Sequence, residues 1–126
     1  MCSYRCDNGE STGSNRYYCK VGSMTVATTH EEIMTELVSN GPMMVGLMIY
    51  EDFMNYEAGI YKHVTGEELG GHAMKLVGYG HDENEGLYWE LQNQWSEDWG
   101  EKGFVRVKAG EIGIDSVALA CMPDLI

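Results

Sequence analysis

Basic residues are scarce in this sequence. Its 126 residues include 8 lysines and arginines against 20 aspartates and glutamates, which gives a formal net charge of −12 and a pI near 4.5. A protein of that charge repels the phosphates of nucleic acids and the headgroups of anionic membranes. The charge balance therefore excludes nucleic acid and membrane surfaces as expected partners.

Long hydrophobic runs and prolines are also few. The longest apolar run, Met43 to Tyr50, contains Gly46 and is far shorter than the roughly 18 residues that span a bilayer. The first residues lack the apolar core of a signal peptide, so any secretory address is expected outside this chain. With 44% apolar residues, 22% charged residues and 2 prolines, the composition is typical of one folded domain with one core.

Metal-ligand motifs are missing as well. The four cysteines are Cys2, Cys6, Cys19 and Cys121, and their spacing contains no C-x2-C pair with a suitable histidine close by. The acidic loop from Asp82 to Gly86 lacks the bidentate acid that closes a calcium loop, so a solvated hairpin turn is the simpler interpretation. We expect no metal and no cofactor.

Disulfides are the better interpretation of the cysteines. Residues 1–22 have no periodicity and predict a loop held by crosslinks, with Cys2, Cys6 and Cys19 as candidates. Sequence alone leaves the pairing open, and a Cys6–Cys19 bond is one alternative because the loop it closes is short. Cys121 follows an apolar stretch, which favours a small buried thiol.

The remaining sequence predicts one helix followed mostly by strands. Thr28 and Thr29 offer N-cap hydroxyls to an amphipathic stretch, which Asn40-Gly41-Pro42 ends. Residues 51–64 predict a short helical turn and a connecting loop. Strands are predicted at 43–50, 73–79, 87–95 and 104–108. The predicted fold class is α+β, with one helix packed on a strongly curved, barrel-like antiparallel β-sheet.

One histidine follows two glycines at the start of a predicted strand, in the segment Gly70-Gly71-His72-Ala73. Glycines would let an extended peptide approach the imidazole closely, and the strand would hold the ring still. A histidine at a strand edge is more often a hydrogen-bonded structural residue. On this segment alone, the structural interpretation is favoured.

An amide lies beside two tryptophans in residues 91–100. Asn93 can accept an imidazole N–H without adding charge, and the indole of Trp95 over that contact would exclude water and strengthen it. The competing interpretation is a turn-forming asparagine next to a tryptophan cluster, and this segment by itself favours it.

Considered together, these segments resemble a known family. Several short motifs occur in a fixed order: Asn40-Gly41-Pro42, Gly70-Gly71-His72-Ala73, Gly78-Tyr79-Gly80, Tyr88-Trp89, Asn93-Gln94-Trp95, Asp98-Trp99-Gly100, Gly103-Phe104 and Gly113-Ile114. Over most of residues 24–123, their order and spacing resemble the C-terminal half of papain-like cysteine peptidases. Residues 52–67 and the Cys-x3-Cys opening are similar to the cathepsin B-like members.

The resemblance implies hydrolysis of peptide bonds by a Cys-His-Asn site. His72 would be the general base and acid paired with a cysteine thiolate, and Asn93 would accept its N–H and fix its tautomer. Trp95 would shield that hydrogen bond, and Trp99 would pack beside it on the leaving-group side. The family also implies a lysosomal, vacuolar or secreted location.

The nucleophile of such an enzyme is not found in this sequence. None of the four cysteines has the helix-start setting that the reaction requires. We therefore expect residues 1–126 to be a C-terminal domain whose partners are a peptide or protein substrate and an N-terminal peptidase domain carrying the catalytic cysteine. In the family, Cys2 and Cys6 would pair with cysteines upstream.

Two departures from the family pattern bear on function. Gln94 stands where the family usually has serine, which favours the alternative of a non-catalytic papain-like remnant that binds a peptide or partner. Val117 stands where cathepsin B has a glutamate that accepts arginine, so we expect a preference for apolar side chains, with Gly46 and Gly71 lining the same pocket. The apolar face of an isolated half also predicts self-association.

Overall fold

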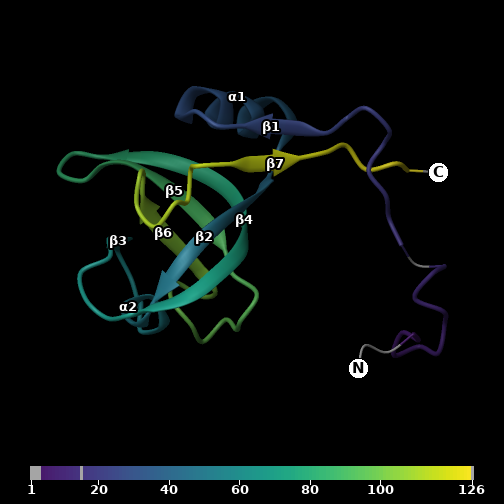
Figure 1. The fold of residues 1–126 in the computed structure, drawn as a ribbon, viewed down its shortest axis with the longest axis horizontal. Coiled ribbons are helices and arrows are strands. Elements are labelled where there is room, and N and C mark those ends of the chain that lie inside the picture. Colours follow the sequence, from purple (N-terminus) through teal and green to yellow (C-terminus); the bar gives the residue numbers. More distant parts are fainter. Residues whose placement is uncertain (1–3, 15, 126) are drawn as a thin grey trace. The chain divides into compact units, whose positions relative to one another are not determined.

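The computed structural model describes residues 4–14 and 16–125. They form two compact units. One comprises the described residues up to Thr25 together with those from Cys121 onward, and the other is Val26–Ala120. The described part of the first 22 residues consists of turns and short bridges, as the sequence predicts. The second unit holds the helices and nearly all of the sheet (Figure 1).

The first helix, α1 (His30–Asn40), begins and ends where the sequence predicts. The side chain of Thr29 accepts a hydrogen bond from the backbone N–H of Glu32, and the Glu32 carboxylate accepts one from the backbone N–H of Thr29. This capping box satisfies N–H groups that the first helical turn cannot pair internally. Gly41 then leaves the helix with a φ of 105°, which few residues other than glycine adopt.

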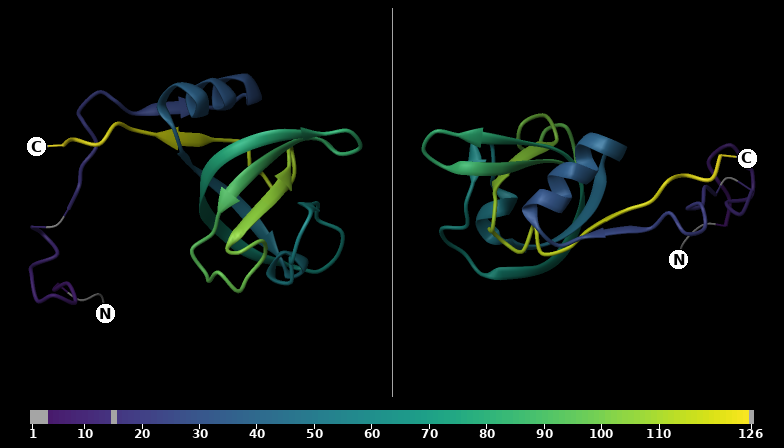
Figure 2. Two further views of the ribbon diagram at one scale, coloured as in Figure 1. Left: turned by 180° about the vertical axis from the view of Figure 1, so that it is seen from behind. Right: turned by 90° about the horizontal axis from the view of Figure 1, so that it is seen from above.

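The described residues contain one seven-stranded sheet in the order β1-β7-β2-β4-β5-β6-β3. The strands are β1 Thr25–Ala27, β2 Met43–Tyr50, β3 Ile60–Tyr61, β4 Glu68–Asp82, β5 Gly86–Gln92, β6 Phe104–Lys108 and β7 Ala118–Ala120. The sheet is strongly curved, and Figure 2 shows β4 and β5 sweeping round it as one long hairpin. The α+β class is confirmed, although the sheet is open and mixed, since β3 pairs parallel with β6.

Two strand boundaries differ from the predicted ones. The strand β4 starts at Glu68, so His72 lies within a strand and pairs with Leu47 of β2. The strand β5 stops at Gln92, because the backbone N–H of Asn93 donates to the carbonyl of Gly103 instead of to β4. The predicted helical turn after β2 is the short helix α2 (Glu51–Met54).

A single hydrophobic core fills the space inside the curved sheet. Alternate residues of the strands point into it, while α1 contributes Ile33 and α2 contributes Phe53. The largest fully buried side chains are Trp89, Phe53, Ile33, Met74, Leu76, Leu91, Ile114, Val45, Val105 and Val107. Each buried side chain of this size stabilises the fold by about 1.5–3 kcal/mol through removal of apolar surface from water.

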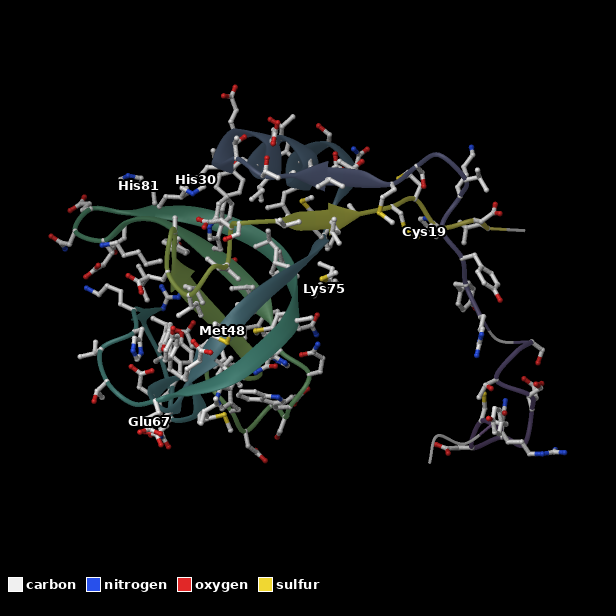
Figure 3. All side chains as sticks on the ribbon, viewed as in Figure 1. Cys19, His30, Met48, Glu67, Lys75 and His81 are labelled. Atoms are coloured by element: carbon white, nitrogen blue, oxygen red, sulfur yellow. A yellow bond between two sulfur atoms is a disulfide. The ribbon has the colours of Figure 1, made fainter. Side chains whose placement is uncertain are left out.

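Cys19 and Cys121 form a disulfide, drawn in yellow beside the Cys19 label in Figure 3. The expectation of a buried thiol at Cys121 is therefore wrong, and so is the alternative Cys6–Cys19 bond. The two segments run antiparallel, with the backbone N–H of Lys20 donating to the carbonyl of Met122, which places the Cα atoms of the two cysteines 5.6 Å apart. Cys2 lies outside the described residues, and the pairing of Cys6 stays a prediction.

None of the helices in residues 4–14 and 16–125 is both long enough and apolar enough to span a membrane.

Candidate active site

His72 and Asn93 lie side by side at one end of the β4–β5 hairpin. The imidazole Nε2 is 2.9 Å from the side-chain oxygen of Asn93, although the residues are 21 positions apart in the sequence. His72 is half-buried, whereas Asn93 is only 8% exposed. The sequence prediction that an amide lies within hydrogen-bond reach of this imidazole agrees with the geometry.

The hydrogen bonds around Asn93 indicate which nitrogen of His72 carries the proton. An amide oxygen can only accept, so Nε2 must donate to it, and Nδ1 then keeps its lone pair. The same oxygen also accepts the backbone N–H of Gln94 at 2.9 Å, which fixes the orientation of the amide. Among the residues that the structure describes, Nδ1 of His72 has no hydrogen-bond partner, so this nitrogen is available to exchange a proton.

The amide nitrogen of Asn93 has no such partner. It is buried, and within the described part of the chain nothing accepts a hydrogen bond from it. A buried donor without an acceptor costs about 1–3 kcal/mol. The side chain of Asn93 is therefore held in place by what its oxygen accepts and by the packing around it.

Trp95 covers the imidazole. Its ring stacks on that of His72 with centroids 5.1 Å apart and planes 27° apart, and it remains 37% exposed. Trp99 meets Trp95 edge-on at 5.0 Å. An indole roof, formed by the residue that the sequence predicts, therefore lies over one face of the imidazole. Its shielding of the His72–Asn93 hydrogen bond from water stays a prediction.

The indole roof rests on aromatic residues that the sequence analysis did not assign to the site. Phe53 of α2 contacts Trp95 and Trp99, with centroids at 5.9 and 5.2 Å, and the indole N–H of Trp99 donates to the carbonyl of Met54. Tyr56 packs on Trp99 at 5.5 Å, and burial raises the pKa of Tyr56 to about 12. The high aromatic content of residues 50–61 was the available signal for this support.

The loop that carries both tryptophans makes a tight turn. Gly100 has a φ of 60°, and a Cβ there would lie 2.7 Å from the carbonyl oxygen of Phe104. Only glycine fits this position without moving the backbone. The turn is closed by an ion pair between Arg106 and Glu101 with a shortest distance of 2.6 Å, and hydrogen bonds from Arg106 lower the pKa of Glu101.

Two of the three predicted pocket residues, Gly46 and Gly71, lie on the paired strands β2 and β4. Gly46 pairs with Ala73, the residue after His72, and Gly71 pairs with Met48. The third, Val117, is 44% exposed and directly precedes β7, whose Ala118 pairs with Val45, the neighbour of Gly46. That the three residues line one pocket stays a prediction. A Cβ on Gly46 or Gly71 would meet no atom within 4 Å, so open space lies over both.

His63, unlike His72, contacts a carboxylate, and it does so in a structural setting. His63 Nδ1 lies 3.1 Å from Asp52, which accepts further hydrogen bonds from the hydroxyl of Tyr61 and the backbone N–H groups of Val64 and Thr65. Burial opposes ionisation of Asp52, but these hydrogen bonds outweigh it and hold the pKa of Asp52 well below its usual range. Asp52 thereby organises the turn after β3.

No metal site competes with this arrangement in the described residues. Nowhere among them do three histidine, cysteine, aspartate or glutamate side chains gather closely enough to hold an ion. The site in these residues consists instead of an imidazole, an amide and an indole roof, a set that can hold and transfer a proton.

Comparison with known proteins identifies the class. The family described as "Papain family cysteine protease" matches residues 2–122. The chain therefore belongs to the papain family of cysteine proteases, and the resemblance that its motifs predicted is confirmed.

Within the family, several of the proteins that it resembles are named cathepsin B-like. The chain is 37% identical to "Cathepsin B-like protease 1" of Arabidopsis thaliana over 97% of its own length and 33% of that protein. It is 47% identical to "Cathepsin B-like cysteine proteinase 5" of Caenorhabditis elegans over 75% of its length and 28% of that protein. Among solved structures, procathepsin B S9 from Trypanosoma congolense has a TM-score of 0.79 and 31% identity, covering 91% of this chain and 41% of the other.

The chain thus spans about a third of the length of the curated relatives it matches. The part that is similar corresponds to a C-terminal half of cathepsin B.

Proposed function

We propose that this chain supplies the general acid and base of a cysteine peptidase site. His72 is that group, Asn93 orients it, and the thiolate comes from an N-terminal peptidase domain. The single observation that carries the proposal is the 2.9 Å contact from His72 Nε2 to the Asn93 amide oxygen under the ring of Trp95, because it leaves Nδ1 to exchange the proton.

The proposed reaction uses His72 twice. A thiolate attacks the peptide carbonyl carbon, and imidazolium Nδ1 gives its proton to the leaving amine as the C–N bond breaks, which leaves a thioester on the cysteine. Water then attacks the thioester while Nδ1 takes its proton, and the acid product and the cysteine are released. The paired charges of thiolate and imidazolium stabilise one another, so the cysteine stays ionised below its ordinary pKa.

A fusion protein tests the proposal. The part of the Arabidopsis relative that precedes the matched region is joined to this chain, and hydrolysis of fluorogenic peptides is measured. The fusion should cleave peptides, whereas the chain alone should not, because it lacks the thiolate. A folded fusion that binds peptides without cleaving them would favour the non-catalytic remnant instead.

The open space over Gly46 and Gly71 is the proposed substrate pocket, and its lining determines the proposed substrate preference. With Val117 at its edge and glycines at positions 46 and 71, we propose that it accepts apolar side chains, and the fusion should prefer leucine or valine to arginine there. Val117→Glu should raise the relative kcat/KM for an arginine substrate by about 10- to 100-fold, the size of a charge-assisted hydrogen bond. Val117→Gln, equal in size but uncharged, is the control. A parent fusion that prefers arginine would contradict the assignment.

The proposed partner of the chain is an N-terminal peptidase domain that carries the catalytic cysteine. Large apolar side chains are exposed on the unit Val26–Ala120 near the site: Met44, Leu69, Trp95, Phe104 and Val117. With nothing to cover them, the isolated chain should self-associate, and light scattering should show a mass that rises with concentration. A constant monomer mass at high concentration would count against the proposal that these apolar side chains are covered by a partner domain. We also propose the lysosomal, vacuolar or secreted location that membership of the family implies.

A further inference from the structure

The two strands that carry the site separate just before it. The β4–β5 ladder has its last pair at Lys75 and Gln92, after which the backbone of Asn93 turns to bond with Gly103. Continued by two residues, the same register would set residue 94 opposite Ala73. The backbone has left the ladder there, so the carbonyl of Ala73 lacks the strand partner that its position predicts.

The side chain of Gln94 takes the place of that missing strand bond. Its amide Nε2 donates to the carbonyl oxygen of Ala73 at 2.6 Å, while its backbone N–H donates to the side-chain oxygen of Asn93 at 2.9 Å. That oxygen also accepts Nε2 of His72, the neighbour of Ala73 along the chain. Four residues are therefore joined in a closed ring of hydrogen bonds and peptide bonds.

We propose that Gln94 is a positioning residue for the pair of His72 and Asn93. It holds β4 at Ala73 and the loop at Asn93 at a fixed separation, so neither His72 nor Asn93 can move away from the other without breaking a second hydrogen bond. The length of the glutamine is what permits this, because its amide lies one methylene further from the backbone than that of asparagine. A residue that departs from the family pattern thus supports the site.

The test measures the imidazole itself in the ¹⁵N-labelled chain. A long-range ¹⁵N–¹H spectrum gives the fraction of neutral His72 with the proton on Nε2, without requiring the exchangeable proton to be seen. Gln94→Met keeps the length and removes the donor, while Gln94→Asn keeps the amide and shortens its reach. The matched control is Gln92→Met, at an exposed glutamine of the same hairpin whose pairing with Lys75 uses the backbone.

In the parent and the Gln92→Met variant, His72 should be almost entirely in the Nε2–H form. In both Gln94 variants, the ratio of Nδ1–H to Nε2–H should rise by about 3- to 10-fold. This factor corresponds to the net free energy of one exposed hydrogen bond. Unchanged ratios in the Gln94 variants would overturn the proposal, and so would an equal rise in the control, which would indicate general loosening of the hairpin. The importance of Gln94 for turnover rests on the proposed function, but the tautomer measurement does not. The positioning role of Gln94 and the peptidase function can therefore fail separately.

Discussion

Replacing His72 with alanine should lower the kcat/KM of the fused enzyme by about 10³-fold or more, because general acid and base catalysis contributes about 10²–10⁴-fold. Asn93→Ala should cost about 10²-fold, the loss expected when a catalytic group is misplaced by about 1 Å. Both are measured with the same fluorogenic peptide and compared with His81→Ala. His81 is exposed, pairs with Leu87 near the far end of the hairpin and is labelled in Figure 3.

Alkylation of the cysteine by iodoacetamide tests whether His72 stabilises the thiolate, independently of peptide hydrolysis. In the parent fusion, the thiolate should react at mildly acidic pH, because the imidazolium of His72 stabilises it. In His72→Ala, the reaction should need a pH approaching the ordinary cysteine value of about 8.5. If His72→Ala retained both acid-range alkylation and hydrolysis, His72 would not be the group paired with sulfur.

Much of this site could be predicted from the sequence, since its residues carry recognisable local chemistry. Glycines before His72 and an amide followed by two tryptophans point to a proton-handling pair, and the geometry brings that pair together. The contributions of Phe53 and Gln94 could not be found in this way. Both depend on contacts between segments far apart in the chain, 42 residues for Phe53 and Trp95 and 21 for Gln94 and Ala73.

The fold could be predicted from the sequence to a similar extent. The capping residues of α1 and the apolar strands gave the correct elements because those signals are local. The parallel strand β3 has only two residues, too few for a periodic pattern, and the end of β5 depends on a bond to Gly103. Pairings between distant segments produce no periodic pattern within a short window of sequence.

Removing the disulfide should cause the largest loss of stability. The Cys19–Cys121 bond closes a loop with a sequence separation of 102, and a crosslink over about 100 residues stabilises by up to about 4.7 kcal/mol by restricting the unfolded chain. Because β1 and β7 are neighbours in the sheet, the folded chain already holds these segments close. The double variant Cys19→Ser, Cys121→Ser should therefore lose about 2–5 kcal/mol of unfolding free energy, measured by urea denaturation.

Reduction provides the control for this experiment. Dithiothreitol should destabilise the parent by a similar amount and leave the double variant almost unchanged, since the variant has lost the bond that matters. At this chain length, the melting temperature should fall by about 10 °C or more. Equal unfolding free energies for the oxidised parent and the double variant would show that the crosslink does not restrain the unfolded ensemble.

The adjacency of β1 and β7 also makes the unit Val26–Ala120 suitable for circular permutation. Its first and last strands are neighbours in the sheet, so a short glycine-rich linker can join the original ends. New termini can be opened at Glu83 and Asn84, which are exposed in the hairpin turn. The new termini of such a chain would lie in the turn between β4 and β5, at the end of the hairpin remote from the imidazole. Every residue of the site would remain on an uninterrupted strand or loop.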